Sequence, residues 1–96
     1  MSDPKIDKLH ILGRMLKTEE YLVDRLLDSD RLNVSDEAKD FSRAIINYSR
    51  ESQREVHASD VHHIYETNFS GRENTDEFRT VADIFTSEFH RYDEES

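Results

Sequence analysis

The histidines of this sequence lie close to carboxylates and are the residues best suited to metal chemistry. His57, His62 and His63 fall within seven residues, and Glu66 follows His62 by four. Residues four apart share a helical face, and zinc, nickel or iron accept imidazole and carboxylate as ligands. However, His62 and His63 are adjacent and would point about 100° apart on a helix, so one ion could not bind both without strain. The pattern is a weak metal candidate, more typical of a solvated, pH-sensitive helix.

Nothing in the sequence supports enzymatic turnover. The chain has no cysteine, which excludes disulfides, iron–sulfur clusters and thiolate zinc sites. Its two glycines, Gly13 and Gly71, are too far apart to form a phosphate-binding loop, and no nucleophile motif of the GxSxG type occurs. Asp and Glu make up 22 of the 96 residues, so neighbouring carboxylates occur by chance and identify no acid–base pair. We therefore predict a protein that is not an enzyme and uses no cofactor.

Three arginines have the spacing of a nucleic-acid-binding face. Arg43, Arg50 and Arg54 stand seven and four residues apart, so a continuous helix would place them on one side. The formal net charge of −9 disfavours this use, because it repels phosphate backbones. An acidic DNA-binding transcriptional regulator from a halophilic host stays open as an alternative. So does an inhibitor that mimics DNA and occupies the basic groove of a nucleic-acid-binding protein.

Aromatic residues form a stripe near the end of the chain. Phe78, Phe85, Phe89 and Tyr92 recur at offsets of 7, 4 and 3, which places them on one helical face. Such a face could bind a partner helix. It could equally fill the interior of the domain, because a small domain has few other large side chains for its core. In a homodimer the same stripe would bind the other copy and form the shared core of the pair.

The charge is divided unevenly along the chain. Residues 1–17 carry a net charge of +2, residues 18–40 carry −5, residues 41–70 carry −1 and residues 71–96 carry −5. If two copies pair, the basic first helix is the expected neighbour of an acidic block in the other copy. Complementary surface charge of this kind selects protein partners, so we expect a protein partner.

Helical spacing of apolar residues recurs along the chain, and no stretch alternates with the period of a strand. Residues typical of helix starts precede the expected helices: Ser2-Asp3-Pro4, Ser35, Ser59-Asp60, and Asn74 or Thr75. Glu19 interrupts the first apolar stripe, which favours a new helix from that point. The predicted helices cover 4–16, 19–28, 36–53, 60–69 and 76–92.

These signals predict one all-α domain, residues 1–96, with residues 93–96 as an acidic frayed end. We expect a small bundle of four to five helices that self-associates as a homodimer. The longest apolar run is three residues, far short of the roughly 20 that cross a bilayer, and no secretory leader pattern occurs. We therefore expect a cytoplasmic protein without membrane contact. Its predicted role is regulatory, through binding of another protein by helical faces.

Overall fold

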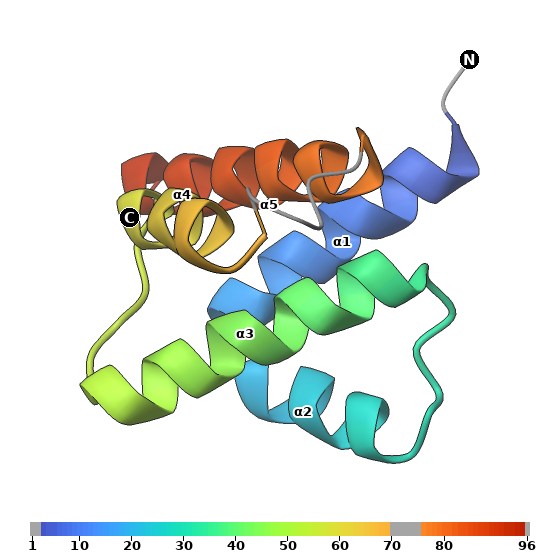
Figure 1. Ribbon diagram of the computed structural model, residues 1–96, viewed down its shortest axis with the longest axis horizontal. Coiled ribbons are helices and arrows are strands. Elements are labelled where there is room, and N and C mark those ends of the chain that lie inside the picture. Colours follow the sequence, from blue (N-terminus) through green and yellow to red (C-terminus); the bar gives the residue numbers. More distant parts are fainter. Residues whose placement is uncertain (1–2, 70–75, 96) are drawn as a thin grey trace.

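The structure describes residues 3–69 and 76–95, and most of these lie in five helices (Figure 1). They are, in a computed structural model, α1 (Pro4–Thr18), α2 (Glu20–Asp28), α3 (Asp36–Ser52), α4 (Ala58–Asn68) and α5 (Asp76–Glu95). The predicted all-α class is confirmed, and no described residue lies in a strand. No helix over these residues has the length and apolar character needed to cross a bilayer.

Local side chains explain where several helices begin. The Asp3 carboxylate accepts a hydrogen bond from the Lys5 N–H at 2.9 Å, and Pro4 occupies the first turn of α1. The Ser35 hydroxyl accepts a hydrogen bond from the Ala38 N–H at 3.3 Å at the start of α3. Both starts agree with the sequence. The cap expected at Asn74 or Thr75 lies outside the described residues.

The first two predicted helices are separate, as the interruption at Glu19 indicated. Glu19 leaves helical geometry, with φ −139° and ψ 50°, and the chain changes direction there. Because of this change, the Glu19 carboxylate is exposed and does not interrupt the apolar stripe. Val23 and Leu27 of α2 become buried. α2 contacts only α1 and α3 among the described helices.

Several helix ends differ from the prediction by one to three residues, and two of these differences have a clear cause in the side-chain contacts. α4 begins at Ala58 rather than at residue 60, because His57 is its N-cap and the Asp60 carboxylate accepts the His57 N–H at 2.9 Å. α5 continues to Glu95 instead of ending at residue 92. The expected frayed end at 93–96 is therefore helical as far as Glu95, since Asp93 is ion-paired with Lys17 at 3.0 Å.

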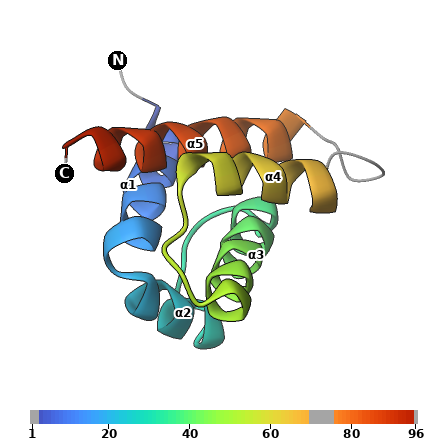
Figure 2. The ribbon, with the colours of Figure 1, turned by 90° about the vertical axis from the view of Figure 1, so that its left-hand side faces the viewer.

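The helices are arranged around α5, which contacts α1, α3 and α4. Figure 2 shows α4 and α5 side by side and antiparallel across one end of the molecule. α1 and α3 extend away from this pair, and α2 lies at the opposite end between them. α1 meets α5 closely at Gly13, where a Cβ atom would stand 3.1 Å from a ring carbon of Phe85.

The aromatic stripe of α5 is part of the chain's own core. Phe78, Phe85 and Phe89 are at most 5% exposed. Phe41 of α3 lies edge-on to Phe85, with ring centroids 5.7 Å apart. Tyr92, at the end of the stripe, is only partly buried. The three phenylalanines therefore cannot form the docking face predicted for a partner in a folded chain, because a small interior uses its largest apolar groups to exclude water.

Candidate functional site

Charged side chains link α1 to α5 along most of their shared length. Four pairs join a cation or histidine of α1 to a carboxylate of α5, at distances from 2.6 to 3.1 Å: Lys5–Glu77, His10–Glu88, Arg14–Glu95 and Lys17–Asp93. The basic first block and the acidic last block of the sequence are thus neighbours within one chain. The sequence suggested that the two blocks would meet between two copies of the chain. In the structure they meet within a single copy.

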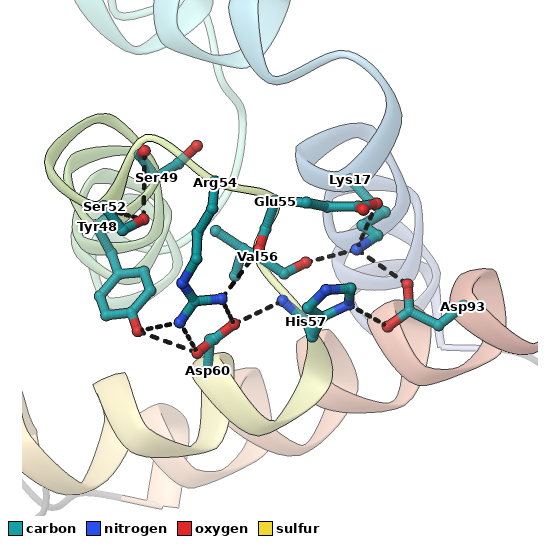
Figure 3. Close-up of polar contacts among 10 residues, drawn as sticks. All are labelled: Lys17, Tyr48, Ser49, Ser52, Arg54, Glu55, Val56, His57, Asp60 and Asp93. Atoms are coloured by element: carbon teal, nitrogen blue, oxygen red, sulfur yellow. Dashed lines mark hydrogen bonds and ion pairs between the residues drawn. The ribbon is translucent and has the colours of Figure 1, made fainter.

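Lys17 is the most enclosed of these cations, with a side chain only 2% exposed. Its ammonium group pairs with Glu55 at 3.1 Å and Asp93 at 3.0 Å, and donates to the Val56 carbonyl (Figure 3). It also lies 5.3 Å from the centre of the Phe89 ring. One side chain therefore ties the end of α1 to the connection before α4 and to the end of α5. Burial alone would raise the pKa of Asp93, but hydrogen bonds from Lys17 and His57 hold it below its ordinary value.

Replacing Lys17 with Met tests this linkage. We expect Lys17→Met to lower the free energy of unfolding by about 1–2 kcal/mol, because it removes a buried ion pair while its partners keep partial solvent access. Urea denaturation followed by circular dichroism measures the change. Lys39→Met is the control, since Lys39 pairs with Asp30, whose side chain is 85% exposed. Equal effects of the two substitutions would contradict the special role of Lys17.

Asp60 is the centre of a second polar cluster, at the start of α4 (Figure 3). Its two carboxylate oxygens accept from the Arg54 guanidinium at 2.8 and 3.0 Å. They also accept from the Tyr48 hydroxyl at 3.0 Å and the His57 N–H at 2.9 Å. The Arg54 hydrogen bond, with those of His57 and Tyr48, lowers the pKa of Asp60 to about 2 against the opposing effect of burial. This cluster holds the α3–α4 connection in place, and its carboxylate is fully engaged in doing so.

The histidines of the metal hypothesis are not brought together. His57 faces α5, with its Nδ1 atom 3.2 Å from Asp93. His62 pairs with Glu66 along the exposed face of α4, and His63 lines a groove between α3 and α4. Among the described residues, no three His, Asp or Glu side chains are placed to hold a metal ion. The seven residues from His57 to His63 span about two helical turns and several directions, so closeness in the sequence does not bring these side chains to one point.

The three arginines of the nucleic-acid hypothesis do not share a helical face. α3 ends at Ser52 and Gln53 adopts a left-handed conformation with φ 53°, so Arg54 leaves the side that carries Arg43 and Arg50. Each arginine is also paired with a carboxylate, in the pairs Arg43–Asp40, Arg50–Asp24 and Arg54–Asp60. The spacing argument fails because it assumed a helix through residue 54.

An apolar groove lies between α1 and the connection 29–35, which follows α2. Two adjoining hollows of about 340 and 230 Å³ share Lys8, Asn33 and Val34. We call them together the α1 groove; its apolar lining includes Leu9, Ile11, Leu12, Met15, Leu32 and Val34. Its charged lining residues are lysines, with no carboxylate among them, although the chain is strongly acidic.

A second hollow, of about 700 Å³, lies on the outer side of α2; we call it the α2 hollow. Its lining residues are Leu22, Arg25, Leu26, Asp28, Ser29 and Arg31. The connection 29–35 borders both sites, because Ser29 and Arg31 line the α2 hollow while Leu32 and Val34 line the α1 groove. The two therefore flank one connection and belong to the same region of the molecule.

The large apolar side chains that remain exposed are all in this region. Over the described residues they are Ile11 at 60%, Tyr21 at 73% and Leu22 at 41% exposed, all on α1 and α2. The sequence pattern did not predict this exposed group. The available signal was that Ile11 falls outside the stripe of Leu9, Leu12 and Leu16, so it could not be buried with those residues.

Comparison of the chain with models of protein families, with curated proteins and with solved structures finds no match in any of the three. The candidate site is therefore identified from the geometry of this chain alone. The two polar clusters, around Lys17 and Asp60, connect parts of the fold to each other. The α1 groove and the α2 hollow are the places where apolar side chains remain accessible.

Proposed function

We propose that this chain is a non-enzymatic domain that binds another protein on the α1 groove and the α2 hollow. The observation that supports the proposal most directly is the grouping of exposed large apolar side chains on α1 and α2. Burial of an apolar side chain contributes about 25 cal/mol for each Å² removed from water. Ile11 and Leu22 are thus available as anchoring contacts, and hollows beside them can accept side chains from a partner.

The polar groups of the chain support binding rather than catalysis. The most enclosed carboxylates are Asp60, which accepts hydrogen bonds from Arg54, Tyr48 and His57, and Glu88, which pairs with His10 at 2.6 Å. A general acid or base needs to reach a substrate within hydrogen-bond distance. Both carboxylates are instead used between helices of the fold.

The substitution Ile11→Asp tests the binding surface. We expect it to remove the partner or weaken its binding at least about ten-fold, because it places a charge where the partner buries apolar surface. Proteins retained by the immobilised chain from a lysate of its source cell are identified by mass spectrometry, and the retained protein is purified and titrated by calorimetry. The stability of the variant should change by less than about 0.5 kcal/mol, since Ile11 is exposed.

Ser87→Asp is the matched control, because it adds the same charge at an exposed position of α5. It should leave binding unchanged. If Ile11→Asp and wild type bind the purified partner equally, the α1 groove is not the binding site. A partner lost equally from both variants would show that net charge, rather than this surface, controls binding.

Two other roles make different predictions for the same assay. A DNA mimic would bind a nucleic-acid-binding protein whose DNA competes for it, with affinity falling steeply as salt rises. An acidic DNA-binding regulator would retain DNA and lose it when Arg43, Arg50 and Arg54 are changed to Gln. Neither role gives Ile11 a part in binding, so the Ile11→Asp variant separates them from the proposal.

A further inference from the structure

Three of the four described cations that lack an ion-pair partner line the proposed binding surface. Of the described lysines and arginines, four have no carboxylate of the described residues within 4 Å: Lys8, Arg25, Arg31 and Arg79. Lys8 lines the α1 groove, while Arg25 and Arg31 line the α2 hollow. Unpaired cations are unexpected in a chain in which acidic residues outnumber basic ones by 22 to 13. The grouping therefore indicates that carboxylates from outside the chain would fit here.

We propose that the occupant of this surface is an amphipathic helix of another protein, with leucine-like side chains on one face and Asp or Glu along the edges of that face. This inference rests on the proposed function for its location. The apolar lining of the α1 groove would receive the apolar face. Lys8, Arg25 and Arg31 would meet the acidic edges, which fixes the orientation of the helix and raises its rate of association.

Nucleic acid and anionic membranes match this surface less well. Both present a dense array of negative charge, and the formal net charge of −9 repels such an array over the rest of the molecule. A phosphate backbone also has no side chain that would fill a groove lined by Leu9, Ile11 and Met15. A single acidic helix would need to contact only the α1 groove and the α2 hollow, and it would add apolar contacts there.

A second copy of this chain also matches less well. In a symmetric pair that uses the α1 and α2 region, the same surface lies on both sides of the interface. Lys8, Arg25 and Arg31 of both copies would then lie in one interface, and the lining of the two sites supplies only Asp28 as a carboxylate to pair with them. The predicted homodimer consequently gains no support from the charges of this region.

Two synthetic peptides of about sixteen residues test the charge requirement. Both carry Leu at positions three and four apart, and they differ only in having Glu or Lys along the edges of that face. Binding of each labelled peptide to the intact chain is measured by fluorescence anisotropy at low and moderate salt. We expect the Glu peptide to bind at least about ten-fold more tightly than the Lys peptide, with the difference shrinking as salt rises.

Charge reversal at Lys8 gives the matched comparison. Lys8→Glu should weaken binding of the Glu peptide by about five- to ten-fold and strengthen binding of the Lys peptide. Arg79→Glu makes the same change of charge at an unpaired cation of α5 that lines neither the α1 groove nor the α2 hollow, and should alter both affinities by less than about two-fold. Equal effects of the two reversals would overturn the proposal, because only long-range net charge would then matter.

Parallel measurements separate the other occupants. Duplex DNA, vesicles rich in phosphatidylserine, and the unlabelled chain itself are tested by the same method and by sedimentation. Tighter binding of any of these than of the Glu peptide, lost in Lys8→Glu, would overturn the acidic-helix proposal. If neither peptide binds while a purified partner still depends on Ile11, the partner chemistry inferred here is wrong and the proposed function stands. If the Glu peptide binds while Ile11→Asp leaves binding of the purified partner unchanged, the inferred partner chemistry stands and the proposed function is wrong.

Discussion

Replacement of Phe85 with alanine should lower the free energy of unfolding by about 3–5 kcal/mol. Phe85 is 0% exposed and lies edge-on to Phe41 of α3, with ring centroids 5.7 Å apart. It also stands beside Gly13, where a Cβ atom on α1 would lie 3.1 Å from its ring. The alanine variant would lose apolar contacts between three helices and leave a cavity that the neighbouring side chains cannot fill. Urea denaturation followed by far-ultraviolet circular dichroism measures this loss.

The same substitution distinguishes the two interpretations of the aromatic stripe. If the stripe were a docking face, Phe85→Ala would leave stability nearly unchanged and abolish binding. Tyr21→Ala provides the control, because Tyr21 is aromatic but 73% exposed, and its change in stability should stay within about 0.5 kcal/mol. A cost below about 1 kcal/mol for Phe85→Ala would contradict the packing described above.

Replacement of Asp60 with alanine should cost about 3 kcal/mol. The substitution leaves the Tyr48 hydroxyl and the His57 N–H without their acceptor and the Arg54 guanidinium without its ion pair. It also removes the side chain that anchors the first turn of α4. Asp60→Asn keeps a neutral acceptor of similar size and should cost less. Denaturant unfolding at pH 6 compares the two variants with wild type.

The contribution of Asp60 should depend on pH in a direction set by its pKa. Its pKa is lowered from 3.8 to about 2 in the folded chain, so the folded state binds this proton less readily than the unfolded state does. The stabilisation, about 2 kcal/mol, is therefore fully present above about pH 4 and is lost as the pH falls through about 2. The difference in stability between wild type and Asp60→Asn should shrink over that interval. A difference that stays constant from pH 6 to pH 2.5 would show that the ionised form is not the stabilising one.

The Phe85 prediction concerns the way α1, α3 and α5 are fixed, and this bears on the proposed binding surface. α1 has two uses: Leu9, Leu12 and Leu16 are buried in the core, while Ile11 and Met15 line the α1 groove. The groove keeps its shape only if α1 stays docked on α5. The ion pairs between α1 and α5, including that of the enclosed Lys17, thus hold the helix on which the binding surface is built.

The sequence by itself determined the helices and most of the core. Its apolar residues recur with the period of a helix, and its caps at Asp3 and Ser35 satisfy backbone N–H groups within three residues, so both are local properties that need no tertiary information. The stripe of Phe78, Phe85 and Phe89 also marked a buried face correctly. Whether that face was covered by the same chain or by a partner was not local, and the sequence left it open.

Only the tertiary structure decided which charges neutralise each other and which remain free. Lys17 meets Asp93 although 76 residues separate them, and Asp60 depends on Tyr48, which belongs to another helix. Helical periodicity reports which side of a helix is apolar, and it contains no information on which helix packs against that side. The groove beside Ile11 likewise depends on tertiary packing. It arises where a connection between two helices passes α1 without covering it, and only the packing of the whole chain places the connection there.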